Sequence, residues 1–124
     1  MKIPGPDHPI TIAPHPNRVR IVFNGQTIAD TTRALVLSEA NYKPVFYIPR
    51  EDVRSGLLER TAKSTHCPYK GDASYFTIHV DDRASEDAIW SYETPFPAMN
   101  EIAGHMAFYP NRVDEIRDER PEAV

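Results

Sequence analysis

The sequence predicts a mainly β domain, either a small antiparallel barrel or two packed sheets, with short peripheral helices. Twelve prolines in 124 residues exclude long helices and long central strands, because proline lacks an amide donor. Short runs of β-branched and aromatic residues alternate with turn signals along the whole chain. The length and a hydrophobic content of 40% fit a single globular domain over residues 1–124.

The first elements are an arm and a hairpin. Residues 1–17 contain five prolines and are expected to form an extended arm, in which residues 10–12 add an edge strand. Residues 19–23 and 26–30 alternate around Asn24-Gly25, a pair that accepts the positive φ angles of a type I′ turn. A hairpin with this two-residue loop would place Ile21 opposite Ile28.

Two further strands and a short helix are expected next. Residues 34–38 alternate, and residues 44–48 form a dense run of β-forming side chains between two prolines. Pro49 suits the first turn of a helix over residues 50–55, which Gly56 would end.

The central part of the chain predicts two turns joined by strands. A strand is expected to end at Cys67 and enter a β-turn over residues 67–70, because proline prefers the second position of such a turn. Strands are expected at residues 73–80 and 88–92, with a turn at Asp81-Asp82. That turn would pair Tyr75 with Ala88.

The C-terminal part predicts short elements and an acidic tail. Residues 96–104 are expected to form one or two helical turns that end at a glycine, and residues 105–109 a strand. Residues 111–117 suggest a short terminal helix, followed by an acidic tail over residues 118–124.

The charge and cysteine content restrict the partners. Residues 114–124 carry −3 of the total charge of −4, so the rest of the chain is nearly neutral and a nucleic-acid partner is not expected. No signal peptide and no run of about 18 apolar residues is present, so no membrane partner is expected. A single cysteine excludes an internal disulfide and fits a cytoplasmic location.

Cys67 and Lys70 are candidate catalytic residues. In the expected turn the Lys70 ammonium would lie near the thiol and make it more nucleophilic. His66 is a poorer partner, because neighbours on a strand point to opposite faces. The alternative is that Cys67 is a small buried apolar residue and Lys70 is solvated.

An aromatic face is the second candidate site. The expected register places Trp90 and Tyr92 on the same face as Tyr75, and Tyr109 joins them from another strand. Rings with polar tips commonly line pockets for small molecules. The alternative is a β core. The same register opposes Phe76 to a carboxylate, which indicates a bulge or a longer loop.

The sequence shows no motif for a cofactor or a metal. It has no Gly-rich phosphate loop, and its scattered histidines lack the spacing of a zinc site, so no cofactor and no metal are expected.

Several short runs resemble the bacterial domain of unknown function 427 family over roughly residues 18–113. The residues that carry the resemblance are Cys67-Pro68-Tyr69-Lys70-Gly71, Ala73-Ser74-Tyr75, Trp90-Ser91-Tyr92 and Phe108-Tyr109, preceded by Ala29-Asp30, Arg33-Ala34, Glu39, Tyr47-Ile48-Pro49 and Asp52-Val53. The resemblance implies a small all-β fold of the tent-like kind, some of whose members bind small molecules in an aromatic pocket. Zinc held by paired cysteines does not carry over to a chain with one cysteine. A nucleotidyltransferase label attached to the family is not supported, because the Gly-Ser and Asp-x-Asp metal site is missing.

Three functions remain open from the sequence. The first is a domain that binds an unidentified small molecule, with a pocket bordered by Cys67 and Lys70 and by ligand-binding aromatic residues. These aromatic residues are Tyr69, Tyr75, Trp90, Tyr92 and Tyr109. The second is a thiol-dependent enzyme that uses Cys67. The third is a structural or interaction module, with a homodimer joined at an edge strand.

Overall fold

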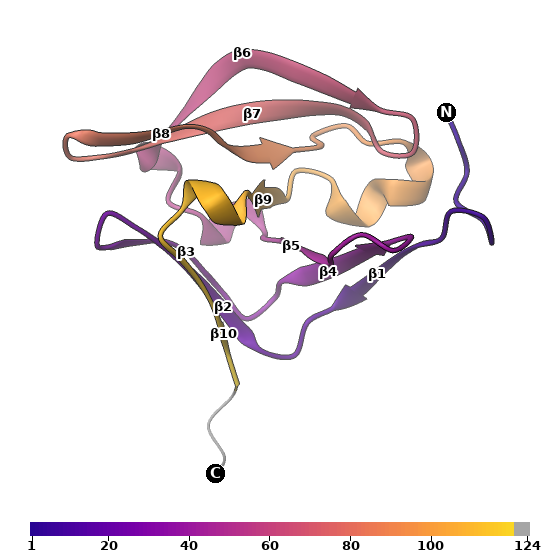
Figure 1. The fold of residues 1–124 in the computed structure, drawn as a ribbon, viewed down its shortest axis with the longest axis horizontal. Helices are drawn as coiled ribbons and strands as arrows, with labels where there is room; N and C mark the ends of the chain where they lie inside the picture. The colour runs from indigo at the N-terminus through magenta and orange to yellow at the C-terminus, as the bar shows by residue number, and fades with distance from the viewer. Residues whose placement is uncertain (121–124) are drawn as a thin grey trace.

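The computed structural model describes residues 1–120, which form ten strands and four short 3₁₀ helices (Figure 1). The elements in chain order are β1 (Ile10–Pro14), β2 (Arg18–Phe23), β3 (Gln26–Thr31), β4 (Leu35–Glu39), β5 (Val45–Tyr47), η1 (Arg50–Asp52), η2 (Ser55–Leu57), β6 (Leu58–Cys67), β7 (Gly71–Val80), β8 (Arg83–Ser91), η3 (Pro97–Ile102), β9 (Met106–Phe108), η4 (Pro110–Arg112) and β10 (Glu115–Glu119).

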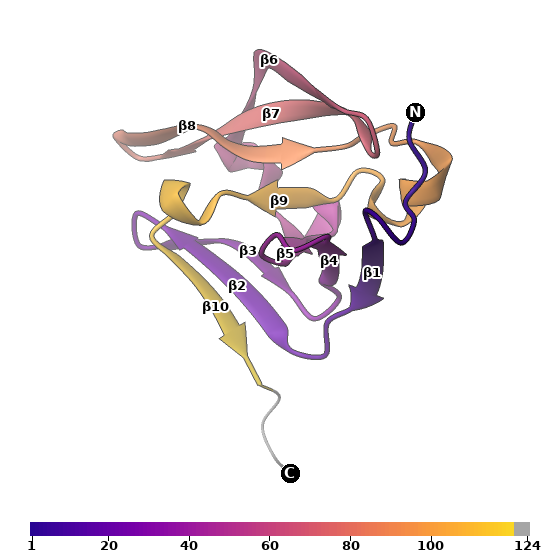
Figure 2. The ribbon, with the colours of Figure 1, turned by 45° about the vertical axis from the view of Figure 1, so that its right-hand side comes forward.

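The strands form three antiparallel sheets. Their strand orders are β1-β4-β5, β10-β2-β3 and β6-β7-β8-β9. Figure 2 shows the four-stranded sheet lying across the top of the molecule, with the two three-stranded sheets side by side below it. The prediction of a mainly β domain with short peripheral helices is confirmed. Within residues 1–120 the three sheets do not close into a barrel. No helix in this described part is long and apolar enough to cross a membrane.

The first hairpin has the predicted loop but a different register. Asn24 and Gly25 both have positive φ, 49° and 77°, as the predicted type I′ turn requires. The register shifts after Val22, however, and Ile21 lies opposite Ala29 rather than Ile28. The extra residue in β3 is a bulge, which a count of residues outward from the loop does not reveal.

The hairpin of β7 and β8 also contains a bulge. Asp81-Asp82 forms the predicted turn, with Val80 opposite Arg83. Tyr75 pairs with Trp90, not with Ala88, because β8 bulges out between the pairs formed by Ile78 and Phe76. Asp87 in this bulge has a φ of 50°. The bulge removes the conflict between Phe76 and a carboxylate that the uniform register produced.

The ends of the chain both join sheets. The edge strand predicted at residues 10–12 is confirmed as part of β1, which pairs with β4. The helix predicted over residues 111–117 is wrong. Only η4 is helical, and β10 pairs with β2. Ile116 lies between two charged residues and packs on the core, while β2 gains a hydrogen-bonded partner, which together favour a strand there.

The acidic tail is partly structured. Asp118 and Glu119 belong to β10, where Glu119 accepts two hydrogen bonds from Arg20 at 2.6 Å. Residues 121–124 of the predicted tail lie outside the described residues. The helix predicted over residues 50–55 divides into η1 and η2, with Val53 extended between them.

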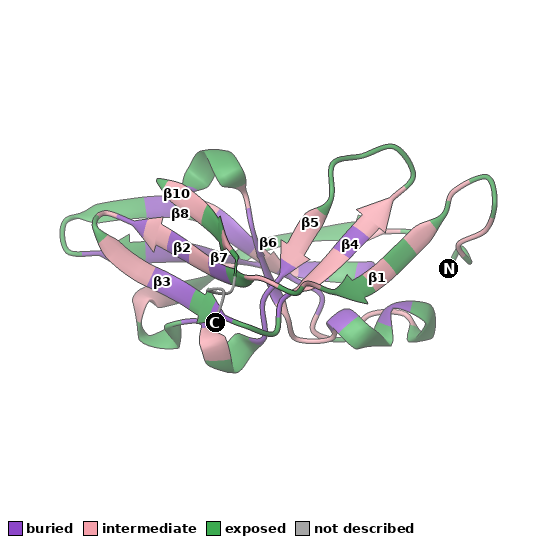
Figure 3. Ribbon diagram, turned by 90° about the horizontal axis from the view of Figure 1, so that it is seen from below, coloured by how far each residue is buried: buried purple, intermediate pink, exposed green. Residues whose placement is uncertain are grey.

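The core has two parts with different chemistry. Beneath one half of the four-stranded sheet it is mainly aliphatic and includes Ile21, Ile78 and Ile89. The other half covers a cluster rich in tyrosine, which includes Tyr47 and Tyr92. Figure 3 shows buried residues in the middle of the strands and exposed residues in the loops. The tyrosine-rich part brings polar atoms into the interior.

Glu93 links two arginines beside the four-stranded sheet. Arg60 donates two hydrogen bonds of 2.8 Å to its carboxylate and Arg50 donates one of 3.1 Å, while both guanidinium groups lie over the Phe76 ring. The Arg60 hydrogen bonds are the main reason that the pKa of Glu93 falls to about 2, against the opposing effect of burial. Because its folded pKa lies below its unfolded value of 4.5, this carboxylate stabilises the fold above about pH 4.5. The contribution is lost as the pH falls towards 2.

We therefore expect Glu93→Gln to reduce the free energy of unfolding at pH 7 by about 1 kcal/mol, since the three hydrogen bonds are partly screened by solvent. The difference from the wild type should shrink between about pH 4.5 and 2 in urea titrations. Glu51→Gln is the control, because Glu51 and its partner Arg33 are both highly exposed. Equal pH profiles for Glu93→Gln and the wild type would contradict the assignment.

Candidate functional site

A cavity of about 290 Å³ opens between the β1-β4-β5 sheet and the strands β7, β8 and β9. It is lined by aromatic rings and a few charged or apolar side chains. The lining residues are Leu37, Glu39, Tyr42, Lys43, Val45, Tyr47, Lys70, Tyr75, Trp90, Tyr92 and Tyr109. We call this space the aromatic cavity.

The aromatic rings hold one another in place. The Trp90 ring centroid lies 4.4 Å from that of Tyr109, and the Trp90 indole N–H donates to the Tyr47 hydroxyl at 3.2 Å. The hydroxyls of Tyr75 and Tyr109 lie 3.4 Å apart, and Thr65 bonds to Tyr75 at 2.9 Å. The rings that form the cavity walls are therefore held by contacts with one another and with Thr65.

Three tyrosine hydroxyls of the cavity, those of Tyr47, Tyr92 and Tyr109, have a raised pKa and are protonated at neutral pH. Burial raises the pKa of Tyr47 and Tyr92 far above the ordinary value of 10. Burial, followed by the hydrogen bond with Tyr75, raises the pKa of Tyr109 to about 12. Tyr92 differs from the other two, because its hydroxyl has no hydrogen-bond partner among residues 1–120. It is a free neutral donor and acceptor at the cavity.

Lys70 and Glu39 form an ion pair at the cavity wall. The Lys70 side chain is only 8% exposed and that of Glu39 15%, and the ammonium donates to Oε1 of the carboxylate. His8 Nε2 donates to the other oxygen at 2.7 Å. Burial acts most strongly on Glu39 and opposes its charge, but the hydrogen bonds from Lys70 and His8 together lower its pKa. The carboxylate is therefore ionised at neutral pH.

The predicted turn over residues 67–70 places Lys70 in this pair. Cys67 pairs with Gly71 across a loop of three residues. Gly71 has a φ of 107°, and a Cβ there would lie 3.6 Å from the backbone of Pro95 and Phe96. Phe96 donates its amide hydrogen to the Lys70 carbonyl at 3.0 Å. The positive φ of Gly71 is what requires glycine in this turn, and the bond from Phe96 holds the Lys70 backbone.

The N-terminal arm covers the outside of this turn. The Lys2 amide donates to the Pro68 carbonyl at 2.7 Å, and the His8 ring stacks on Tyr69 with centroids 4.2 Å apart. His8 thus contacts both Tyr69 and Glu39. The proline-rich arm is not a free extended segment, since it packs beside the aromatic cavity.

Five predicted site residues come together and two do not. Lys70, Tyr75, Trp90, Tyr92 and Tyr109 all line the aromatic cavity. Tyr69 lies outside it, under His8. Cys67 is half-buried and packs against the tyrosine-rich cluster without lining the cavity. Its Sγ lies 3.8 Å from the Lys70 nitrogen, but the Lys70 charge is shared with Glu39.

Sequence reasoning missed the wall formed by β4 and β5. Glu39 and Tyr47 belong to this wall, as do Leu37 and Val45. Alternation gave a partial signal, since Leu37 shares a strand face with Glu39 and Val45 shares one with Tyr47. No local sequence pattern indicates that the β1-β4-β5 sheet packs against β7 and β8.

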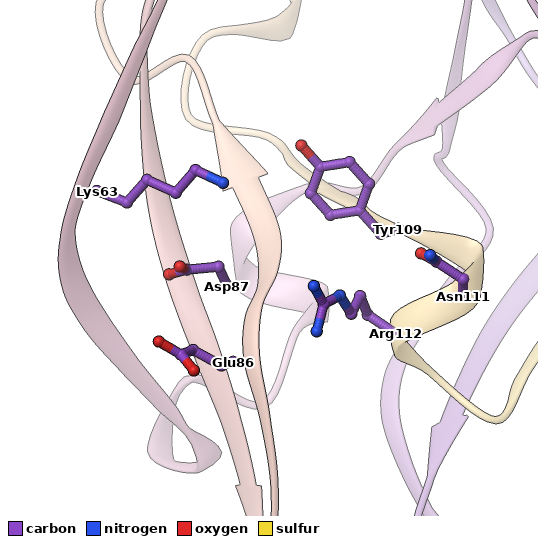
Figure 4. Close-up of a pocket in the computed structure, with 6 residues that line it drawn as sticks. All are labelled: Lys63, Glu86, Asp87, Tyr109, Asn111 and Arg112. Carbon is purple, nitrogen blue, oxygen red and sulfur yellow. The ribbon is translucent and has the colours of Figure 1, made fainter.

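A second, polar cleft of about 420 Å³ adjoins the aromatic cavity (Figure 4). Its lining residues are Lys63, Glu86, Asp87, Tyr109, Asn111 and Arg112. Tyr109 lines both spaces. Nothing in the local sequence grouped the other five residues, which come from β6, β8 and η4.

The described residues contain no group of three or more His, Cys, Asp or Glu side chains placed to hold a metal ion. The aromatic cavity presents aromatic faces, the phenolic hydroxyl of Tyr92 and a buried ion pair at one wall.

Comparison with known proteins assigns the chain to a family. No curated protein matches the sequence. The model of a family described as a domain of unknown function, DUF427, matches residues 11–119, which include every residue of both cavities. The match covers nearly the whole chain, so this protein belongs to the DUF427 family.

Proposed function

We propose that the domain binds a small molecule with a planar ring in the aromatic cavity. The observation that carries this proposal is the Tyr92 hydroxyl, which lies at a cavity of ring-bearing residues with no hydrogen-bond partner among residues 1–120. This hydroxyl is open to the cavity, because no fully buried side-chain nitrogen or oxygen among residues 1–120 lacks a partner. Water bonds to an open hydroxyl in the free protein, and a polar group of a ligand can take the place of that water.

The shape and surface of the cavity select the ligand class. Trp90 and Tyr109 offer aromatic faces for stacking, while Leu37 and Val45 add apolar contact. A volume of about 290 Å³ accepts one or two fused rings rather than a polymer.

The Lys70–Glu39 pair supplies polar selectivity. The ammonium carries three hydrogens, and Glu39 accepts one of them. A ligand carbonyl facing Lys70 gains a charge-assisted hydrogen bond without breaking the pair. We therefore propose a planar ring that carries a carbonyl or amide group.

A thiol-dependent enzyme is the second candidate, favoured by the 3.8 Å approach of Lys70 to Cys67. It ranks lower for two reasons. Glu39 shares the positive charge that would activate the sulfur, and Cys67 does not line the aromatic cavity.

The proposal is tested by titrating the protein with 2-naphthamide while recording the indole N–H signal of Trp90. Trp90 is the only tryptophan, so this signal is unique in an amide correlation spectrum. We expect a saturable shift. Tyr92→Phe should weaken binding about three- to tenfold, because it removes one hydrogen bond and keeps the ring.

Tyr69→Phe is the matched control, since Tyr69 lies outside the cavity, and it should leave the affinity unchanged. A Trp90 signal that does not move would overturn the proposal. Equal losses in the two tyrosine variants would remove Tyr92 from the site.

A further inference from the structure

The polar cleft is built around paired irregularities in the four-stranded sheet. The regular pairing of β6 with β7 is interrupted between Arg60 and Ser64. The pairing of β8 with β7 is interrupted between the partners of Phe76 and Ile78. Thr61 of β6 donates to the Asp87 carboxylate at 2.6 Å, and the Asp87 amide donates to Thr77 of β7 at 3.2 Å. The two bulges are thus tied together by specific hydrogen bonds. Bulges are common beside functional sites, where they redirect side chains.

Two cations converge on this cleft. Figure 4 shows the Lys63 ammonium directed towards Tyr109 and the Arg112 guanidinium directed into the space below that ring. The carboxylates of Glu86 and Asp87 point the other way in the same view, and that of Asp87 is held by Thr61.

Both cations lack a counterion in the part of the chain that the structure describes. Within residues 1–120, neither Lys63 nor Arg112 has a carboxylate within 4.0 Å, and neither side chain donates a hydrogen bond. By contrast, Arg83 on the same strand as the acidic residues is held by Asp114 through two bonds. The Arg112 backbone is fixed all the same, since Ser85 donates to its carbonyl at 2.6 Å. Arg112 is therefore anchored but uncompensated.

The polar cleft meets the aromatic cavity at Tyr75 and Tyr109. Tyr109 lines both spaces, and the Lys63 ammonium lies 4.6 Å from the centroid of the Tyr75 ring, whose residue lines the aromatic cavity. The Tyr109 side chain is therefore a wall that the two spaces share.

We propose that the polar cleft is an oxyanion subsite, in which Lys63 and Arg112 bind a carboxylate or phosphate substituent of the molecule held in the aromatic cavity. This inference rests on the proposed function and makes it more specific: the ligand is a planar acid. Arg112 supplies a planar fork that matches two oxygens, and Lys63 supplies a point charge on the opposite side.

The test compares 2-naphthoate with 2-naphthamide, which have the same ring and nearly the same shape but differ in charge. Both titrations follow the Trp90 indole signal, and 2-naphthyl phosphate distinguishes a phosphate site from a carboxylate site. We expect the wild type to bind at least one of the two anions about tenfold more tightly than the amide, as a charge-assisted pair of contacts predicts. Lys63→Met/Arg112→Gln should abolish this preference and leave amide binding unchanged.

Arg54→Gln is the control that removes one positive charge away from the site, because Arg54 lines neither space and bonds to Gln26. Equal affinity of the wild type for the amide and both anions would overturn the subsite. A preference that survives in the double variant would do the same and would assign the anion to Lys70 or Lys43. If none of the three compounds moves the Trp90 signal, the proposed function fails instead, which is a distinguishable result.

Discussion

Glu39→Gln is expected to destabilise the domain by roughly 2 to 3 kcal/mol, because it leaves the Lys70 ammonium in the interior without its counterion. Both side chains are largely buried, so solvent compensates little for the lost charge. Urea unfolding at pH 7, followed by the fluorescence of Trp90, gives the change in the free energy of unfolding.

The double variant Glu39→Gln/Lys70→Met is the control that separates charge from packing. Removing both charges should recover most of the lost stability, since no unpaired ion remains. Additive losses in the double variant would show that the two residues act independently. The alkylation rate of Cys67 with iodoacetamide is a second measurement. In Glu39→Gln the Lys70 charge is no longer paired with a carboxylate, so Cys67 should be alkylated faster than in the wild type.

Ile78→Ala is expected to cost about 3 kcal/mol, the usual loss when a fully buried branched side chain is truncated. Ile78 is 0% exposed and lies in the aliphatic part of the core. The neighbouring His79 points outward, where it bonds to the exposed Glu59. His79→Ala should therefore change the stability by less than about 0.5 kcal/mol.

The comparison between these two neighbours tests the face that β7 turns towards the core. Equal losses for Ile78→Ala and His79→Ala in urea unfolding would contradict the register of β7 with β6 and β8. A larger loss for His79→Ala would mean that the strand is turned over.

Local signals in the sequence predicted turns and strands well. Asn24-Gly25 and Asp81-Asp82 both form the expected hairpins, and the turn that begins at Cys67 lies where its proline placed it. These features depend on φ preferences of a few adjacent residues, so one sequence carries enough information to find them.

Register was harder to predict, because each hairpin contains a bulge. The bulges change the cross-strand partner of Ile21 from Ile28 to Ala29, and that of Tyr75 from Ala88 to Trp90. A bulge depends on packing and on hydrogen bonds such as that from Asp87 to Thr77, which join residues of different strands. Even so, the predicted shared face of Tyr75 and Trp90 was kept, since cross-strand partners lie on the same side of a sheet.

The C-terminal strand was missed for a related reason. Residues 115–119 have no strong β propensity, and their pairing is decided by the open edge of β2, nearly a hundred residues away. The pair of Arg20 with Glu119 adds to this long-range contact. Tertiary context of this kind overrides weak local preference.

The candidate site was predicted only on one side. Residues of the turn and of β7 and β8 are near one another in sequence, and so Lys70, Tyr75, Trp90 and Tyr92 were grouped correctly in space. Lys70 bonds to Glu39, which lies 31 residues away, and His8 of the docked arm bonds to the same Glu39 carboxylate. Those contacts decide the charge of the site, and no local pattern shows them.

A neighbouring pocket means that the test of the proposed function must show where the ligand binds. Trp90 and Val45 also line an apolar pocket of about 280 Å³ on the other side of the indole, together with Phe46, Phe108 and Ile116. A ligand in either space would shift the Trp90 signal. Only the aromatic cavity contains Tyr75 and Tyr92.

The most direct test is therefore a measurement of intermolecular nuclear Overhauser effects between 2-naphthamide and the protein. We predict contacts from the naphthalene protons to the rings of Tyr75 and Tyr92, and none to Phe108 or Ile116. Contacts confined to Phe108 and Ile116, with none to Tyr92, would contradict the assignment of the aromatic cavity as the binding site.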